Sequence, residues 1–144
     1  MIAPRTAPRR WAYTLPVDAT LRDTDGLGHV NHVVYITWFE EARTRYVAER
    51  LGFTDIHQVN FVLASATVHF RSPVYFPEVV EVSLAPTRVG TKSWDLAYEG
   101  RVRGGGRLVV EGTTTQVQFD FKAKSSVPIP DDWRRVLEAD LVSR

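Results

Sequence analysis

The sequence has no cysteine among its 144 residues. Disulfides, thiolate metal sites and a cysteine nucleophile are therefore excluded, and the absence is compatible with a reducing cytoplasm. No apolar run approaches the roughly 20 residues that a membrane-spanning helix needs. The basic N-terminus lacks the apolar stretch that follows in a secretory signal. These absences predict a soluble, cytoplasmic protein that does not enter a membrane.

The sequence also has no large excess of positive or negative charge. The 18 lysines and arginines are nearly balanced by 17 aspartates and glutamates, which leaves a net charge of +1. Proteins that bind nucleic acids or membrane surfaces concentrate basic residues on one face, so neither partner is expected. The four histidines show no metal-ligand spacing with one another. We therefore predict no metal and no cofactor.

The composition itself is that of a globular protein, with 44% hydrophobic and 24% charged residues. The length suits one domain with a full core. Residues 1–10 combine prolines with arginines, a composition typical of a flexible arm. The sequence thus predicts a flexible N-terminal arm over residues 1–10 and a single domain over residues 11–144.

The first half of the domain predicts one strand and one long helix. Apolar and polar residues alternate over residues 11–21, which predicts a strand, and Pro16 favours an edge position in the sheet. A helix is expected after the turn 23–29, with Asn31 as its N-cap and Gly52 just beyond its end. Its first half is apolar nearly all round and its second half is charged, which predicts a buried start and a more exposed end.

The second half of the domain reads as strands, over residues 61–70, 79–89, 93–102 and 108–119. A short helix over residues 131–142, capped by Asp131 or Asp132, is expected after a linker. The order predicts a four-strand antiparallel meander. Since a sheet can bury a long enclosed helix only by curling round it, the pattern predicts an α+β protein with a curved antiparallel sheet.

Residues 22–35 contain the candidate catalytic groups of the sequence. The N-terminus of a helix presents free N–H groups and a positive dipole end, which can hold a developing oxyanion. Asp25 precedes it, and a carboxylate there can attack an acyl carbon or activate water. This segment therefore contains the groups of an acyl-transfer or ester-hydrolysis site that uses a carboxylate and needs no serine or cysteine nucleophile and no metal. The alternative is that Asp23 and Asp25 only cap the turn.

The segment from Asp23 to Arg43, DTDGLGHVNHVVYITWFEEAR, resembles the signature of the 4-hydroxybenzoyl-CoA thioesterase family of the hotdog superfamily. The resemblance continues through the Tyr75-Phe-Pro77 segment and covers about residues 11–138. It implies a hotdog fold, in which a curved antiparallel β-sheet wraps a long central helix. It also implies an acyl-CoA thioesterase that releases a carboxylic acid and free coenzyme A. Subunits of such proteins pair so that active sites form between them, which implies a homodimer or homotetramer.

The resemblance also assigns roles to residues. Asp25 matches the catalytic aspartate, acting as nucleophile or general base, and the backbone amide of His32 matches the donor that polarises the thioester carbonyl. Tyr35 matches a position that lines the pocket. Lys92, and more weakly Arg88, lie near a turn where basic residues of some relatives meet the nucleotide phosphates. The other substrate contacts implied are Gly28, His29 and Asn31.

The sequence departs from the family pattern at three places. His32 stands where asparagine is commoner, and Pro77-Glu-Val79 replaces the usual Gly-Asp. The turn 88–93 is less basic than in some relatives. These departures concern the polar contacts of the pocket and the nucleotide contacts.

Several alternatives stay open from the sequence. His29 either contacts a ligand, orients Asp25 or only packs the turn. Glu40 and Glu41 are expected to pair with arginines of the same helix, at Glu40–Arg43 and Glu41–Arg45. Four aromatic residues either line an acyl pocket or form core: Trp38, Phe39, Phe61 and Trp94.

The function has rivals on the same fold. One is a hydratase or dehydratase of acyl thioesters, and another is a non-catalytic module that binds acyl-CoA or acyl-carrier protein. Fold alone does not separate them. The acyl group, and the choice between coenzyme A and carrier-protein thioesters, are not determined by the sequence.

Overall fold

The computed structural model describes residues 11–53, 55–104 and 106–142. The predicted arm, residues 1–10, lies outside the described residues. The elements in chain order are β1 (Tyr13–Asp18), η1 (Leu21–Asp23), α1 (His32–Arg50), η2 (Ile56–Gln58), β2 (Phe61–Phe70), β3 (Val79–Val89), β4 (Ser93–Val102), β5 (Leu108–Asp120), β6 (Ser125–Ser126) and α2 (Asp131–Ala139).

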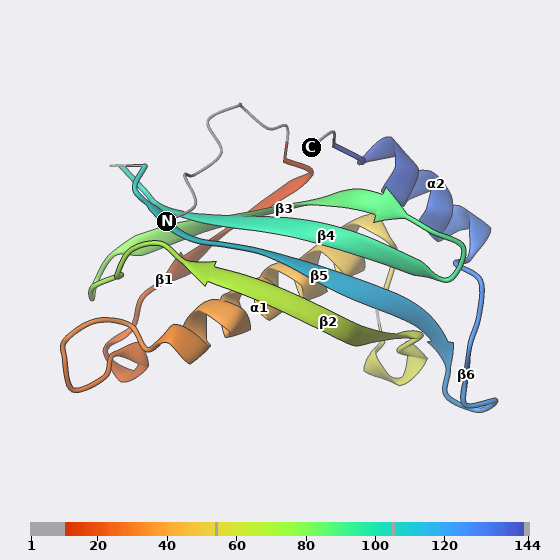
Figure 1. Cartoon of the computed structure of the whole chain (residues 1–144), viewed down its shortest axis with the longest axis horizontal. Coiled ribbons are helices and arrows are strands. Elements are labelled where there is room, and N and C mark those ends of the chain that lie inside the picture. The colour runs from red at the N-terminus through yellow and green to blue at the C-terminus, as the bar shows by residue number, and fades with distance from the viewer. Residues whose placement is uncertain (1–10, 54, 105, 143–144) are drawn as a thin grey trace.

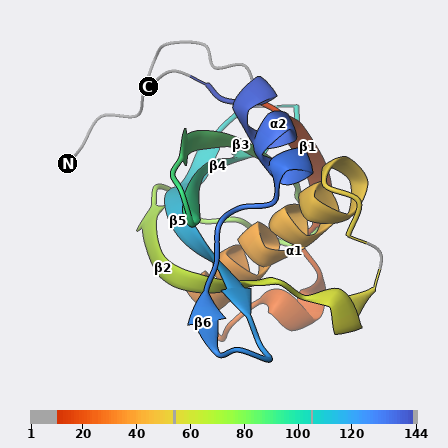
Figure 2. The same ribbon diagram turned by 90° about the vertical axis from the view of Figure 1, so that its right-hand side faces the viewer.

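The main sheet curls round the long helix α1, and α2 lies beside one end of the sheet (Figures 1 and 2). The strand order is β1-β3-β4-β5-β2, and each neighbouring pair is antiparallel. This arrangement confirms the predicted α+β architecture, a helix held by a curved antiparallel sheet. None of the helices in the described ranges has the length and apolar character that a membrane crossing requires.

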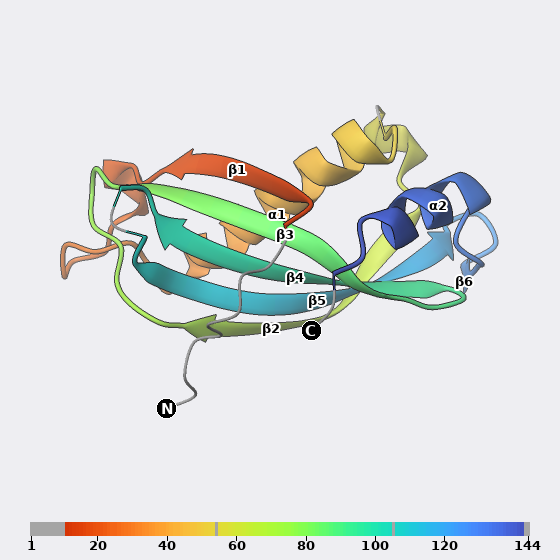
Figure 3. The same ribbon diagram turned by 90° about the horizontal axis from the view of Figure 1, so that it is seen from above.

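The predicted meander was wrong for its first strand. Strand β2 pairs with β5, so only β3, β4 and β5 follow one another in the sheet. Residues 71–78 therefore carry the chain from one edge of the sheet back to β3, past the start of α1 (Figure 3). The backbone N–H of Val30 donates to the carbonyl of Val74 at 2.8 Å, which fixes this connection against the turn before α1.

Most predicted boundaries agree with the structure. Pro16 lies in β1, which is an edge strand as expected. That strand is shorter than predicted, because residues 21–23 turn into the short helix η1. The cap predicted for α2 was wrong: Pro130 occupies the N-cap position, while Asp131 and Asp132 lie in the first turn, where carboxylates favour the positive end of the dipole.

Helix α1 begins and ends as predicted but is buried differently. The Asn31 side chain accepts a hydrogen bond from Val33 N at 3.1 Å, and Gly52 follows the helix with φ +72°. The predicted buried start was wrong, since Val33 and Ile36 are 55% and 44% exposed. Only one stripe of the helix faces the sheet, so apolar residues beside that stripe remain outside. The buried residues on α1 are Tyr35, Trp38, Phe39, Ala42, Arg43, Tyr46 and Val47.

The interior between α1 and the sheet contains several aromatic residues. Phe39 stacks on Tyr98 with ring centroids 4.5 Å apart, and Phe61 packs against Trp94 at 5.6 Å. Trp38, Phe39 and Trp94 are at most 6% exposed. Of the four aromatic residues whose role the sequence left open, Trp38, Phe39 and Trp94 therefore belong to the core, and the partly buried Phe61 packs against it.

Of the two ion pairs predicted on α1, one forms. Arg45 lies 3.6 Å from Glu41. Arg43 instead points inward and donates a hydrogen bond to the Tyr98 hydroxyl at 3.1 Å, so the predicted pair with Glu40 was wrong. Arg43 lies on the sheet-facing stripe and is 8% exposed, whereas Glu40 lies outside that stripe and is exposed.

Candidate active site

The turn before α1 is a small structure closed by its own backbone. Asp25 N donates to the carbonyl of His29 at 2.9 Å, and Gly28 N donates to the carbonyl of Asp25 at 3.2 Å. Gly28 has φ +87°, a conformation that favours glycine over residues with a Cβ. The sequence of this turn therefore fixes where the Asp25 side chain emerges.

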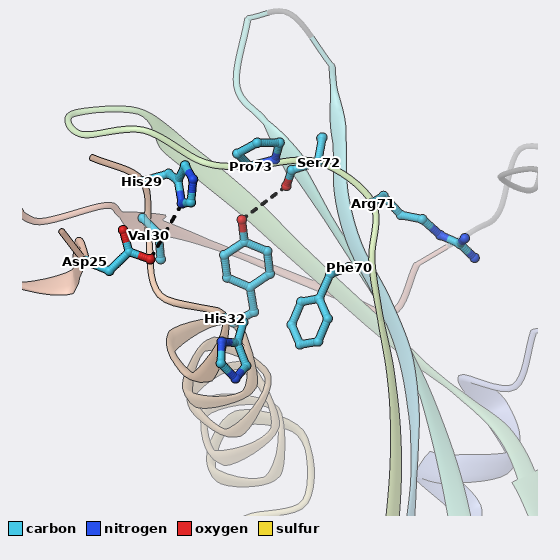
Figure 4. Close-up of a pocket in the computed structure, with 9 residues that line it drawn as sticks. Asp25, His29, Val30, His32, Phe70, Arg71, Ser72 and Pro73 are labelled. Atoms are coloured by element: carbon cyan, nitrogen blue, oxygen red, sulfur yellow. Dashed lines mark hydrogen bonds and ion pairs between the residues drawn. The ribbon is translucent and has the colours of Figure 1, made fainter. Parts of the chain in front are cut away.

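The Asp25 carboxylate is held at one oxygen and faces histidine with the other. Its Oδ1 accepts a hydrogen bond from Leu27 N at 2.8 Å. Its Oδ2 lies 3.7 Å from His29 Nδ1, and both side chains are 33% exposed (Figure 4). Asp23, in contrast, closes the preceding turn, with Oδ2 accepting from Thr20 N at 2.9 Å. The capping role therefore accounts fully for Asp23 and only in part for Asp25.

The first turn of α1 presents a backbone donor beside this carboxylate. The N–H groups of Val33 and Val34 bond to the side chain and the carbonyl of Asn31. The N–H of His32 has no acceptor within the described part of the chain. An N–H in this position carries the partial positive charge of the helix terminus. It is suited to hold a carbonyl oxygen or an oxyanion.

A cavity of about 370 Å³ joins these groups. Asp25, His29 and His32 line it from the turn and the helix, and Phe70 lines it from the end of β2 (Figure 4). Tyr35 donates from its hydroxyl to the Ser72 carbonyl at 3.1 Å across the cavity wall. Burial raises the pKa of Tyr35, which keeps this hydroxyl protonated as a donor. The other residues that line the cavity are Val30, Arg71, Ser72 and Pro73.

Residues 70–73 form a wall that sequence reasoning missed. The sequence marks this segment only as the end of a strand, since a proline follows an arginine and a serine. It reaches the site because residues 71–78 cross the end of the sheet and dock on the turn before α1. The Arg71 side chain turns away from the cavity and pairs with Glu111 at 2.9 Å (Figure 4).

The predicted nucleotide contacts lie elsewhere. Lys92 and Arg88 belong to the β3–β4 turn and the end of β3, at the opposite end of the sheet from the start of α1 (Figures 1 and 3). Arg88 donates to Asp95 at 2.8 Å and to Ser93 at 2.8 Å. Hydrogen bonding to Asp95 raises the pKa of Arg88. One chain therefore does not bring Lys92 and Arg88 to Asp25.

Of the remaining residues considered from the sequence, some help to build the site and others lie outside it. Gly28 and Asn31 belong to the turn and cap that build the site, whereas Glu40 and Glu41 are exposed on α1 and do not line the cavity. Within residues 11–53, 55–104 and 106–142, no cluster of three or more histidine, aspartate or glutamate side chains is placed to hold a metal ion.

Comparison with known proteins gives one family. Residues 19–137 match the model of the thioesterase-like superfamily. The 1,4-dihydroxy-2-naphthoyl-CoA hydrolase of Nostoc punctiforme is 24% identical over 133 residues, which cover 90% of this chain and 88% of that protein.

Solved structures share the same fold. A predicted thioesterase from Bacillus stearothermophilus superposes with a TM-score of 0.85 at 24% identity, over 92% of this chain and 98% of the other. A thioesterase from Thermus thermophilus, solved in complex with coenzyme A and zinc, has a TM-score of 0.79 at 25% identity. The shared part covers 89% of this chain and 98% of that one.

Proposed function

The chain belongs to the thioesterase-like superfamily, and from this premise we propose that it hydrolyses acyl-CoA with Asp25 as the catalytic carboxylate. One observation carries the proposal. Asp25 and His32 line the same cavity, so a carboxylate and a helix N-terminal amide without an acceptor in the described chain flank one space. A thioester carbonyl placed between them meets a nucleophile or base on one side and a hydrogen-bond donor on the other.

The His32 N–H polarises the thioester carbonyl and stabilises the negative charge that develops on its oxygen. Asp25 offers Oδ2, since Leu27 N already holds Oδ1. As a general base, Asp25 takes a proton from water while the water oxygen bonds to the acyl carbon. The C–S bond then breaks, the proton passes to the sulfur, and the products are a carboxylic acid and coenzyme A.

As a nucleophile, Asp25 instead attacks the acyl carbon itself and expels the coenzyme A thiolate, which takes a proton from solvent. The mixed anhydride that results is hydrolysed by water, and Asp25 is regenerated. The other residues of the turn act around this step. The lack of a side chain at Gly28 lets a substrate approach the backbone, Asn31 caps the helix, and His29 and Tyr35 contact the acyl thioester.

We propose further that a second copy of the chain completes the site. Strand β2 is the edge of the sheet, and its Leu63 and Phe70 are 46% and 48% exposed. An exposed edge strand invites pairing with another chain. Lys92 and Arg88 lie at the end of the sheet opposite the start of α1 and Asp25 of the same chain. In a homodimer or homotetramer they approach the nucleotide of a substrate bound by the other subunit.

The test is thiol release from a panel of aromatic, short-chain and long-chain acyl-CoAs. Asp25→Asn retains an oxygen that accepts from Leu27 N but loses the charge, so the fold should persist. We expect kcat to fall about a hundredfold or more, as on loss of a general base, which corresponds to about 2.7 kcal/mol. The best substrate of the panel identifies the acyl class.

Asp23→Asn is the matched control, because it makes the same change two residues away in a carboxylate that only closes a turn. Its kcat should stay near that of the wild type. An unchanged rate in Asp25→Asn would transfer the catalytic role to another carboxylate, with Glu40 and Glu41 next in line. If no acyl-CoA is hydrolysed, carrier-protein thioesters are the next substrates, and then simple binding of acyl thioesters.

A further inference from the structure

Arg107 and Glu78 form an ion pair at the edge of the candidate site, and the mechanism above does not use it. Arg107 Nη2 donates to Glu78 Oε1 at 2.8 Å and to the carbonyl of Pro73 at 2.9 Å. Arg107 lies in the β4–β5 connection, just before β5, whereas both acceptors lie in the connection between β2 and β3. One guanidinium therefore fastens this connection at two points.

Glu78 connects Arg107 to Tyr75 through hydrogen bonds. The same Oε1 accepts a hydrogen bond from Tyr75 N at 2.8 Å, and Glu78 N donates to the Tyr75 carbonyl at 2.8 Å. Tyr75 is thus held by both the backbone and the side chain of Glu78. Hydrogen bonding from Arg107 keeps the pKa of Glu78 below its usual range, so its carboxylate stays ionised at neutral pH.

The opposite side of this connection is part of the catalytic site. Val30 N donates to the Val74 carbonyl at 2.8 Å, and His29 pairs with Tyr75 in a short antiparallel bridge. The rings of His29 and Tyr75 meet edge to face, with centroids 6.0 Å apart. The segment that Arg107 and Glu78 fasten is therefore the surface on which the Asp25 turn rests.

We propose that Arg107 and Glu78 are positioning residues for the hydrolytic reaction. They fix residues 73–78, which hold His29 and Val30 and so set the position of Asp25 and the first turn of α1. The inference rests on the proposed function for its catalytic consequence. Its structural part, that the pair fixes the turn before α1, stands on the contacts alone.

The pair is too exposed to matter much for global stability. The Arg107 and Glu78 side chains are 41% and 25% exposed, and solvent screens such pairs strongly. Catalysis is more sensitive, since a displacement of about 1 Å at a reacting group can lower the rate by about a hundredfold. A loss of kcat without a matching loss of stability is therefore the signature that a positioning role predicts.

The experiment compares Arg107→Met with Arg103→Met. Arg103 belongs to the same β4–β5 connection and, in the described part of the chain, its hydrogen bond and ion pair lead to Val79 and Glu81 of β3 and not to the segment 73–78. We expect Arg107→Met to lower kcat about 5- to 20-fold, with KM changed less than about twofold. Arg103→Met should leave both constants unchanged, and the two melting temperatures should agree within about 3 °C.

Amide hydrogen exchange of Val30 gives a readout that needs no substrate. Its hydrogen bond to Val74 should open more often in Arg107→Met and in Glu78→Gln, so exchange should be faster than in Arg103→Met. Arg107→Lys keeps the charge and one donor at this place and should recover part of the protection and part of kcat.

The two proposals fail separately. If the wild type releases no thiol from any acyl-CoA, the proposed function falls, and Val30 exchange still decides whether the pair fixes the turn. If Arg107→Met exchanges Val30 at the rate of Arg103→Met, the positioning role is refuted whatever the activity. Faster exchange with an unchanged kcat would also refute it, since the loosened turn would then be irrelevant to the reaction.

Discussion

Gly112 lies where the Phe39 ring of the central helix packs on the sheet. It sits in β5 between Val68 of β2 and Tyr98 of β4. A Cβ at this position would lie 2.6 Å from the Phe39 ring and 2.6 Å from the carbonyl oxygen of Thr67. Real Cβ atoms essentially never approach other atoms so closely. Gly112→Ala should therefore displace α1, β2 or both.

The loss of stability in Gly112→Ala depends on whether the atoms in contact with the new Cβ can move. The Phe39 ring is 2% exposed and is held by its stack on Tyr98, and the Thr67 carbonyl belongs to the backbone of a paired strand. Overpacking of a filled core typically costs about 1–3 kcal/mol, and we expect the upper end here because one obstacle is backbone. For a domain of this size, about 3 kcal/mol lowers the melting temperature by roughly 6–12 °C.

The assay is thermal and urea unfolding of the variant beside Gly26→Ala. Gly26 has nothing within 4 Å of its added Cβ. Gly26→Ala should leave the melting temperature unchanged or raise it slightly, because alanine restricts the unfolded chain. The comparison separates the contact at Gly112 from the general effect of replacing glycine by alanine.

A double-mutant cycle with Phe39→Leu tests the stated cause. If the ring is half of the obstacle, Phe39→Leu should cost less in the Gly112→Ala background than in the wild type. Additive effects, within about 0.5 kcal/mol, would show that the two positions do not interact. A melting temperature of Gly112→Ala within about 2 °C of the wild type, on the scale of about 2–4 °C per kcal/mol, would refute the reasoning altogether.

Two further predictions concern Tyr13 in β1 and Lys92 in the β3–β4 turn. The Tyr13 hydroxyl donates to Glu49, and burial together with this bond raises the pKa of Tyr13 to about 12. Its stabilising effect is therefore present below about pH 10, the ordinary pKa of tyrosine, and is lost as the pH rises towards about 12. The difference in unfolding free energy between wild type and Tyr13→Phe should shrink over this range, and a constant difference would contradict the assignment. Lys92→Ala should raise KM for acyl-CoA about 3- to 10-fold without changing kcat, because a phosphate contact binds ground and transition states alike. A thioester that lacks the nucleotide is the control, and an effect confined to kcat would exclude the phosphate contact.

The sequence by itself determined the elements and the class of enzyme. Asn31 and Gly52 mark the ends of α1, and β2, β3 and β4 have the bounds predicted from apolar runs and turns. Capping and turn preferences act between residues close in the chain, so a local pattern is sufficient to read them. The segment 23–43 likewise carried a resemblance to thioesterases, which the match to the thioesterase-like superfamily confirms.

Only the tertiary structure decided which elements meet. Strand β2 pairs with β5 across a long separation in the chain, which sends residues 71–78 past the start of α1 and builds the wall of the cavity. The same packing draws Arg43 under the helix and leaves Ile36 outside. Periodicity fixes which side chains share a face, but it does not determine which other element covers that face. That choice depends on the summed contacts of the whole sheet, and no single segment contains it.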